Sequence, residues 1–385
     1  MSDPSNNSIP TVDPDGPQEI EGLQDIVRNQ VKEAVSNRSF NEWYQERQFE
    51  ENILDGKPYF NGPSPPPDPE RHSPSQLTQC HRKISYRKDN APQEGASPDG
   101  LFWLGTQFEE RIAVPYLQAV ATTDETYVRN SIWIDVNIDV GDETLRLKGT
   151  TDPVITDADG DPLLVTEIKS TSSLDHLSSP KPHHKAQLHA YLYGLTREYD
   201  YVIHDGLVLY GSRKTMDVKA FHVPFDESFW RDTVVEWMRN QTEYREAESL
   251  PPADPSFGWE CNFCSYRNRC GQADTPYKDY GPVGLLPVFT EYREAQLVEY
   301  LDAYADAEAK LTPALANEFT ELASEYGSYD WRCTSCGSSF AWDAVNGDDS
   351  EGPPVCPVCI EQGDFVTLSG PEPDDQLIHA GQSIS

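Results

Sequence analysis

The sequence predicts an α/β protein, in which a mixed sheet is flanked by helices and is followed by a small metal-binding module. Three observations support this fold class. Strand-length apolar segments follow one another between residues 132 and 169, a helix-length segment separates them from further strands, and four cysteines form two pairs near the C-terminal end. With 385 residues, the chain is long enough for two or three domains and a sizeable core.

The first three strands are expected in direct succession. Apolar and polar residues alternate from Ile132 to Val140, and a turn at Gly141 leads into a second strand from Thr144 to Ile155. The segment 156–162 is rich in Asp, Gly and Pro, which is typical of a hairpin loop, and it precedes an apolar strand from Leu163 to Lys169. We expect these strands to form a meander.

Helices are expected on both sides of this meander. One runs from Gly100 to about Ala119, and another from Pro180 to Leu195. Two more strands, Tyr201 to Tyr210 and Met216 to Val223, precede an amphipathic helix from Phe229 to Glu248. The predicted core order is therefore helix, three strands, helix, strand.

Three charged residues mark one corner of this core. Glu167 and Lys169 alternate with Ile168 and so share one face of their strand, and the hairpin can bring Asp152 close to both. Taken alone, such a pair is more often a solvated pair on an edge strand. Two carboxylates and an ammonium group are also a suitable site for a hard divalent cation that acts on a phosphate.

The spacing of these residues resembles a known signature. Asp152-Pro153 followed by Glu167-Ile168-Lys169 is similar to the motif of the PD-(D/E)XK nuclease superfamily, and Gln187 to Tyr191 resembles the Q-x-x-x-Y helix of its RecB-like branch. The resemblance covers about residues 71 to 271. It implies a restriction-endonuclease-like core with the order αβββαβ.

The resemblance also implies roles for single residues. Asp152, Glu167 and Glu109 would hold Mg²⁺ or Mn²⁺, together with a main-chain carbonyl near Ile168, and Lys169 would position the attacking water. RecB-like nucleases often have a metal-binding His four residues after a Gly, where this chain has Glu109 after Gly105. Glu110 is the alternative ligand, and a solvated helix Glu is the alternative without function. Gln187 and Tyr191 share a helix face and could steady Lys169 or a DNA phosphate; otherwise they are a surface Gln and a buried Tyr.

The eight cysteines fall into two groups of four, and in an intracellular protein such spacing favours metal binding over disulfides. Cys261, Cys264 and Cys270 form a C-x2-C-x5-C loop, and Cys80 is the remaining candidate for a fourth ligand. This placement resembles the iron–sulfur branch that includes CRISPR-associated RecB-like exonucleases and the AddB nuclease domain. It implies a [4Fe–4S] cluster. Zn²⁺ is the alternative, and buried thiols that bind no metal are the interpretation without function.

The second group predicts a zinc ribbon. Cys333 and Cys336 are followed, after nineteen residues, by Cys356 and Cys359, a spacing typical of two knuckles around one Zn²⁺. Such ribbons bind nucleic acid or protein, or only cap a fold. Acidic neighbours such as Asp348 argue against DNA, so a protein partner is an option.

The net charge of −35 is unusual for a nucleic-acid-binding protein. Either the protein does not bind DNA, or it comes from a halophilic archaeon, whose proteins carry carboxylates over the whole surface. The even spread of acidic residues favours the halophilic origin.

A helix is expected to begin at Ser73-Pro74, followed by an exposed basic segment around Cys80. This segment could contact phosphates, although a charge run is usually only a solvated face; the candidates are Arg82, Lys83, Arg87 and Lys88.

Composition completes the domain organisation. The expected parts are a disordered tail (1–19), a helical segment (20–60) containing a helix from Glu21 to Val35, a Pro-rich linker (61–70), the nuclease domain with its four-cysteine cluster (71–275), a helical connector (276–328), the zinc ribbon (329–368) and a disordered tail (369–385). No apolar run approaches a membrane span and the N-terminus is not a signal peptide, so a cytoplasmic protein without a membrane partner is expected.

The function that these features predict is metal-dependent hydrolysis of DNA. The resemblance favours single-stranded DNA and exonuclease action, in DNA repair or CRISPR adaptation. The alternative is a catalytically silent module that binds nucleic acid or protein through a nuclease core. The sequence does not determine the oligomeric state.

Overall fold

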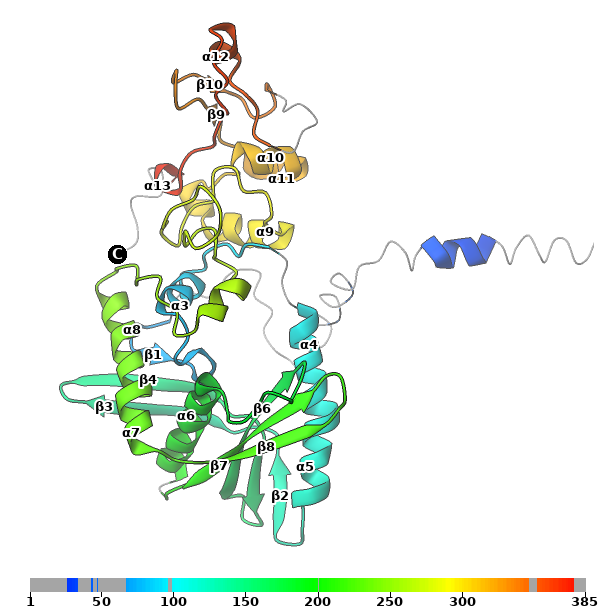
Figure 1. Cartoon of the computed structure of the whole chain (residues 1–385), viewed down its shortest axis with the longest axis vertical. Helices are drawn as coiled ribbons and strands as arrows, with labels where there is room; N and C mark the ends of the chain where they lie inside the picture. The colour runs from blue at the N-terminus through cyan, green and yellow to red at the C-terminus, as the bar shows by residue number, and fades with distance from the viewer. Residues whose placement is uncertain are drawn as a thin grey trace, which may run out of the picture. The chain divides into compact units, whose positions relative to one another are not determined.

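The computed structural model describes residues 26–33, 43, 47, 67–95, 99–199, 201–345 and 352–376, with the side chains of 99–102 excepted. The chain divides into two units, Met1–Phe60 and Asn61–Ser385. In the first unit, residues 26–33 are helical (Figure 1), and the rest of the predicted helix from Glu21 to Val35 lies outside the described residues. The predicted tail 1–19 and most of the predicted linker also lie outside them.

The largest of the three sheets described in the second unit has five strands. Its order is β2-β5-β6-β7-β8, and only β6 and β7 are parallel, so the sheet is mixed. A parallel pair needs a crossover, which is supplied here by α6 (Pro182–Tyr199). The strands are β2 (Thr126–Arg129), β5 (Val154–Asp157), β6 (Pro162–Thr171), β7 (Asp205–Ser212) and β8 (Val218–Pro224).

The predicted three-stranded meander is wrong, because the chain changes sheets between β4 (Glu143–Thr150) and β5. β3 (Trp133–Val140) pairs with β4, which also pairs with β1 (Arg71–His72), in a separate three-stranded sheet. At the break, Pro153 has no N–H for a ladder hydrogen bond, and Thr151 Oγ1 accepts one from the backbone of Ile132 at 2.9 Å. One apolar run in the sequence therefore becomes two strands.

The helix predicted from Gly100 is longer and irregular. It comprises α4 (Asp99–Phe108), a π-helical turn, η2 (Glu109–Ala113), and α5 (Val114–Ala121). Phe108 packs directly on Gly211 of β7, where a Cβ atom would come within 1.7 Å of the Phe108 ring. Only glycine at this position allows the helix to lie so close to the sheet. Figure 1 shows α4 and α5 on one side of the five-stranded sheet and α6 on the other.

The main hydrophobic core lies around α6. Leu188, Leu192 and Leu195 are fully buried against side chains from both sheets, such as Ile134 and Val208. The helix from Glu227 to Glu246 closes this core and consists of α7 (Glu227–Phe229), the π-helical η3 (Trp230–Val235) and α8 (Glu236–Glu246). The predicted fold class, a mixed α/β core flanked by helices with a four-cysteine group beyond it, is confirmed.

The helix predicted to begin at Ser73 is only a 3₁₀ turn, η1 (Pro74–Gln76), and the Ser73 side chain makes no capping hydrogen bond. The chain turns at Thr78, which has a positive φ of 61°, before α3 (His81–Lys88) begins. This left-handed residue separates the two helical segments. A Thr in the αL region is uncommon, so the sequence signal for one helix was misleading.

Small elements make up the rest of the second unit. Gln376 docks the predicted C-terminal tail, since its side-chain amide binds the backbone N–H and C=O of Leu285 at 2.8 and 2.7 Å. The expected disorder is therefore wrong for residues 369–376, while 377–385 lie outside the described residues.

No helix of the described ranges is long and apolar enough to cross a membrane. The elements are η4 (Gly258–Phe263), α9 (Glu294–Ala303), η5 (Ala305–Ala307), α10 (Pro313–Glu318), α11 (Thr320–Tyr326), β9 (Trp331–Arg332), β10 (Ser339–Phe340), α12 (Pro357–Glu361) and α13 (Pro373–Gln376).

Buried His72 makes the fold sensitive to acid. Burial lowers the pKa of His72 to about 2, and its Nε2 is hydrogen bonded to Thr242 Oγ1 at 2.9 Å. The unfolded chain takes up this proton below about pH 6.5, whereas the folded chain does not, so stability is lost as the pH falls. Between pH 6.5 and 4.5 this residue should account for a loss of about 2.5 kcal/mol in the free energy of unfolding.

We expect His72→Gln to reduce this pH dependence by most of that amount, measured by urea denaturation at the two pH values. His222→Gln is the matched control, because the His222 side chain is 62% exposed. Equal pH dependence in His72→Gln and wild type would contradict the prediction.

Candidate active site and metal centres

Asp152 holds the corner between the two sheets. It stands just before β5, and its Oδ2 accepts a hydrogen bond from the backbone N–H of Ile168 in β6 at 2.7 Å. The backbone carbonyl of Pro153 also accepts hydrogen bonds from Thr166, through both the backbone N–H and Oγ1. These contacts set the register of the hairpin, so Asp152 lies beside the residues that flank Ile168, as the sequence analysis expects.

Glu167 is fully buried in the middle of β6, with 0% of its surface exposed. Lys169, which is on the same face of the strand, forms an ion pair with Glu167 Oε1. Neither carboxylate oxygen of Glu167 has a hydrogen-bond partner of good geometry. Burial, and next the negative charge of Asp152, raise the pKa of Glu167 well above its usual value. The charge of Lys169 opposes this rise without cancelling it, so the buried carboxylate is only partly compensated.

Glu109 is the third carboxylate at this corner. It is the first residue of the π-helical turn η2, a type of irregularity that is frequent at functional sites. Burial and the nearby charge of Asp152 raise the pKa of Glu109 to about 7. Its neighbour Glu110 is exposed. The structure therefore places Glu109, and not Glu110, beside the other two carboxylates.

Lys169 is the cation nearest to these acids. Burial lowers its pKa, but Glu167, Asp152 and Glu109 outweigh this effect and the net shift is upward. The ammonium group is therefore charged at neutral pH, and 31% of the Lys169 side chain is exposed. One ammonium group among three carboxylates leaves the site with a net negative charge when all are ionised.

Gln187 and Tyr191 support this corner from α6. Gln187 Nε2 donates to Tyr191 Oη at 2.6 Å, and both side chains are buried. Burial, and next the charge of Glu167, raise the pKa of Tyr191 well above its usual value, so the phenol keeps its proton. The alternative interpretation, in which Gln187 is a surface residue without function, is wrong about its exposure, because Gln187 is only 7% exposed. The pair lies directly behind Glu167.

These residues fit a divalent cation. Glu167 offers two oxygens without hydrogen-bond partners, and Asp152 and Glu109 add carboxylates close enough to shift the pKa values of their neighbours. Oxygen donors of this kind are the ligands that Mg²⁺ and Mn²⁺ prefer. A bound cation would supply the positive charge that the site lacks.

The first cysteine group lines one pocket. Cys80, Cys261, Cys264 and Cys270 all contribute to its wall, although 181 residues separate the first two. Among the described residues, no three of these thiols have all their sulfur atoms within 4.8 Å of one another. A tetrahedral zinc site would hold sulfurs about 3.8 Å apart, given Zn–S bonds of about 2.3 Å. The pocket is therefore wider than the cage of a single ion.

Two carboxylates that the sequence analysis missed support this pocket. Glu94 accepts hydrogen bonds from the backbone N–H groups of Asn268 and Arg269, at 2.6 and 2.7 Å, and so holds the loop that ends in Cys270. Glu260 accepts one from the backbone N–H of Cys80 at 3.0 Å and links the distant fourth cysteine to the loop. Neither has a sequence signal, because only the fold brings Glu94 next to residues 268–269.

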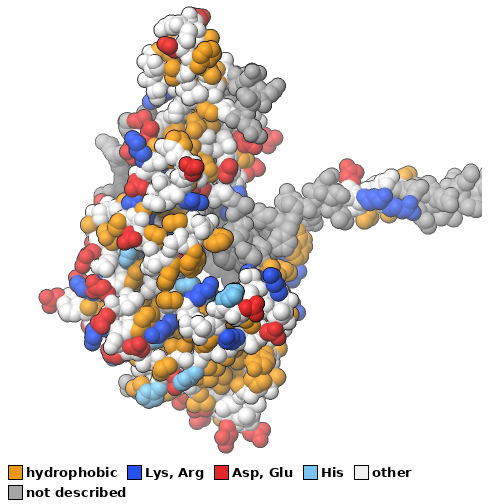
Figure 2. Space-filling model, viewed as in Figure 1, with side chains coloured by type: hydrophobic (Ala, Val, Ile, Leu, Met, Phe, Trp, Pro, Cys, Tyr) orange, Lys and Arg blue, Asp and Glu red, His pale blue; other side chains and the backbone are white. Residues whose placement is uncertain are grey.

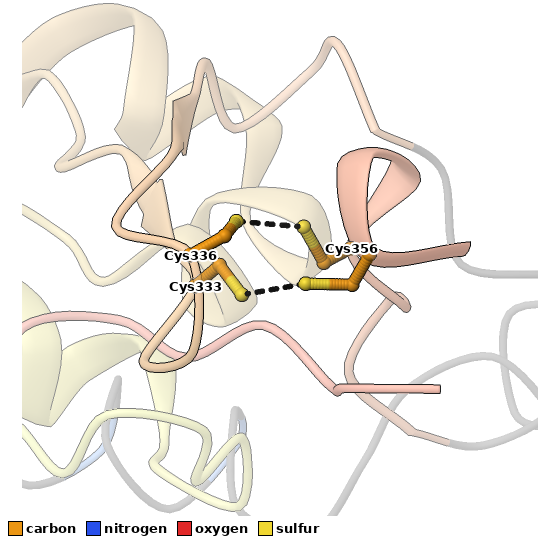
Figure 3. Close-up of side chains that lie close together, drawn as sticks. Cys333, Cys336 and Cys356 are labelled. Atoms are coloured by element: carbon orange, nitrogen blue, oxygen red, sulfur yellow. Dashed lines mark hydrogen bonds between the residues drawn. The ribbon is translucent and has the colours of Figure 1, made fainter. Parts of the chain in front are cut away.

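The second cysteine group is compact. Cys333 Sγ lies 3.6 Å from Cys359 Sγ, and Cys336 Sγ lies 3.6 Å from Cys356 Sγ, with all four sulfurs within 4.8 Å of one another (Figure 3). These separations match the value of about 3.8 Å expected for tetrahedral zinc. The first pair lies in the turn between β9 and β10, and the second pair lies at the start of α12, with Cys356 as its N-cap residue. The chemistry of four thiolates suits Zn²⁺ or an iron–sulfur cluster.

The predicted exposed basic segment is wrong for two of its four residues. Arg82 is 6% exposed and pairs with Asp279 at 2.7 Å, and Lys88 is 7% exposed and donates to the Arg71 carbonyl at 2.9 Å. Both point into the protein because α3 is packed on several sides. Lys83 and Arg87 remain accessible. Figure 2 shows Lys, Arg and His side chains near the middle of the viewed face, with acidic side chains around them.

Comparison with known proteins identifies the superfamily of this chain. A model of the PD-(D/E)XK nuclease superfamily matches residues 30–271, more than half of the chain, and the chain belongs to this superfamily. It is therefore a member of a group of metal-dependent nucleases with a restriction-endonuclease-like fold. A search of curated proteins finds no match. Among solved structures, one titled "Crystal structure of SSO0001" is 18% identical, with a TM-score of 0.41 over 62% of this chain and 100% of that one.

Proposed function

We propose that this protein is a Mg²⁺- or Mn²⁺-dependent deoxyribonuclease that hydrolyses phosphodiester bonds in single-stranded DNA. The observation that carries the proposal is the buried carboxylate of Glu167, which lies beside Asp152 and Lys169 and whose oxygens have no hydrogen-bond partner of good geometry among the described residues. Such a group is unfavourable for stability alone, and metal binding would explain its presence in a chain that belongs to a nuclease superfamily.

Asp152, Glu167 and Glu109 would hold the cation. When bound, the cation supplies Lewis-acid charge for a phosphodiester. Lys169 positions the attacking water and offsets the negative charge that develops on the phosphate. Gln187 and Tyr191 keep Glu167 and Lys169 in place from α6, since the Gln187–Tyr191 hydrogen bond fixes the phenol behind the carboxylate.

We further propose that the first cysteine group holds a [4Fe–4S] cluster. Its pocket is wider than a single-ion cage, and its thiols come from segments on both sides of the nuclease core. A cluster at this place ties Cys80 to the loop 261–270 and so closes the domain. Its role is structural, because Glu167 and Lys169 provide the chemistry.

The remaining assignments concern cellular context. We propose Zn²⁺ in the compact second group, where the sulfur separations suit one ion, and a protein partner for the ribbon. We place the protein in the cytoplasm of a halophile, where thiols remain reduced, and assign it an exonuclease role in DNA repair or CRISPR adaptation.

The test is a cleavage assay on protein purified without oxygen in high salt. We expect end-labelled single-stranded DNA to be degraded with Mn²⁺ and to remain intact with EDTA. The same sample should absorb light near about 400 nm, as iron–sulfur clusters do. A protein that binds single-stranded DNA but does not cleave it with Mn²⁺ or Mg²⁺ would refute the nuclease assignment. A colourless protein with zinc in both cysteine groups would refute the cluster.

A further inference from the structure

An aromatic surface lies between the cysteine pocket and the catalytic corner. Phe257 and Trp259 stack with their ring planes 17° apart and their centroids 6.1 Å apart. The ring of His183, from α6, lies 5.7 Å from Trp259 and 6.1 Å from Phe257. Lys181 places its ammonium 5.6 Å from the centre of the Trp259 ring. We call these four side chains the aromatic platform.

The platform is accessible and held from behind. Trp259 is 47% exposed, so part of its ring is accessible to a ligand. The next residue, Glu260, is 8% exposed and is anchored to the backbone N–H of Cys80. Cys261 follows in the wall of the cysteine pocket. The side chain of Glu260 therefore points into the protein and that of Trp259 points toward solvent. The anchoring of Glu260 thus keeps the Trp259 ring exposed.

The platform lies close to the catalytic lysine. Burial and the charge of Lys181 lower the pKa of His183 to about 4. Lys169 and Lys83 contribute to the same effect. The geometry agrees, because the backbone N–H of Lys181 donates to Tyr210 Oη at 2.9 Å, and Tyr210 of β7 is paired with Lys169 of β6. Three lysines around an aromatic surface stand out in a chain with a net charge of −35. The arrangement combines ring faces for bases with cations for phosphates.

We propose that the aromatic platform, with Trp259 at its centre, is the binding site for unpaired bases of the DNA strand that enters the catalytic corner. Bases of a duplex are already stacked on one another, so an exposed ring favours single strands. Lys181 and Lys83 contact the phosphates of the bound strand. The inference rests on the proposed nuclease function and adds the residues that select single-stranded substrate.

The test compares binding and cleavage in Trp259→Ala and Trp259→Phe. Affinity is measured in EDTA by fluorescence anisotropy with a labelled oligo-dT, with the same length of abasic strand, and with a duplex. We expect Trp259→Ala to weaken oligo-dT binding by about 5- to 100-fold, in line with losses seen when a stacking residue is removed. Trp259→Phe should retain most of the affinity because a ring face remains. Binding of the abasic strand should be the same in wild type and Trp259→Ala.

Trp133→Ala is the matched control. Trp133 is also an exposed tryptophan, at 54%, with the ammonium of Lys148 5.4 Å from its ring centre, but it belongs to β3 of the other sheet. It should bind oligo-dT like wild type. Absorbance near about 400 nm should be unchanged in both variants, which excludes collapse of the Cys261 loop.

The outcomes separate this inference from the proposed function. If wild type cleaves DNA but Trp259→Ala binds oligo-dT as tightly as wild type, the platform is overturned and the nuclease stands. Equal losses for oligo-dT and the abasic strand would also overturn it, because stacking on bases would not be involved. If wild type binds oligo-dT through Trp259 but cleaves nothing, the nuclease proposal fails and the platform stands.

Discussion

Lys169→Ala and Asp152→Ala should each lower the rate of DNA cleavage by at least about 100-fold, since removal of a single charge-stabilising group from a preorganised site has an effect of this size. Lys169 is the cation beside Glu167, and Asp152 both faces the metal site and binds the Ile168 N–H at 2.7 Å. Loss of Lys169 leaves the charge on the phosphate without its partner. The measurement is single-turnover cleavage of end-labelled single-stranded DNA in saturating Mn²⁺.

Lys278→Ala is the matched control for this prediction. Lys278 is exposed and belongs to the segment that follows the cysteine loop, so its removal should leave the rate unchanged. Circular dichroism and absorbance near about 400 nm confirm that each variant is folded with its cluster. Wild-type rates in either Lys169→Ala or Asp152→Ala would rule out the catalytic assignment.

Cys356→Ser should remove about one zinc ion per chain and unfold the ribbon, because a structural zinc contributes about 10 kcal/mol or more to the folding of such a module. Cys356 is fully buried, and its sulfur lies 3.6 Å from that of Cys336 (Figure 3). The hydrophobic cluster around the ribbon, which contains Trp331, Val345 and Leu368, is small. We therefore expect the segment to depend on the proposed metal.

Two measurements check this prediction. Metal analysis by mass spectrometry should show the loss of zinc, and limited proteolysis should produce new cuts within residues 329–376. Thr334→Ala is the control, because Thr334 is exposed between Cys333 and Cys336 and offers no thiolate. If Cys356→Ser kept its zinc and its resistance to protease, the ribbon would not depend on this ligand.

The candidate active site could be predicted largely from local sequence. Glu167 and Lys169 share a strand face because side chains alternate, and Gln187 and Tyr191 meet on one helix turn for a similar geometric reason. Asp152 was within reach because the hairpin is short. The choice between Glu109 and Glu110 was not predictable, since it depends on how the helix lies against the sheet, which brings Glu109 near the charge of Asp152 and leaves Glu110 exposed.

The basic segment shows where pattern alone fails. In the sequence, nothing distinguishes the four basic residues of this segment, which are Arg82, Lys83, Arg87 and Lys88. In the structure, however, Arg82 and Lys88 are buried. Arg82 forms an ion pair with Asp279 and donates a hydrogen bond to the carbonyl of Pro251, which is 169 residues away in the chain. Both partners are adjacent to Arg82 only in the folded protein. A series of charged residues therefore predicts a solvent-exposed helix face only when that face is not packed against other parts of the protein.

Local sequence alone predicted the α/β class, the candidate site residues Asp152, Glu167 and Lys169, and the second cysteine group, because each depends on residues whose spacing is set by one strand, one hairpin or one pair of short loops. Tertiary structure decided the split of residues 144–155 between two sheets, the wide cage formed by Cys80 with the loop 261–270, and the place of Trp259 beside Lys169. These features join segments that are distant in the chain. Their energies come from packing and buried hydrogen bonds that no short window of sequence contains.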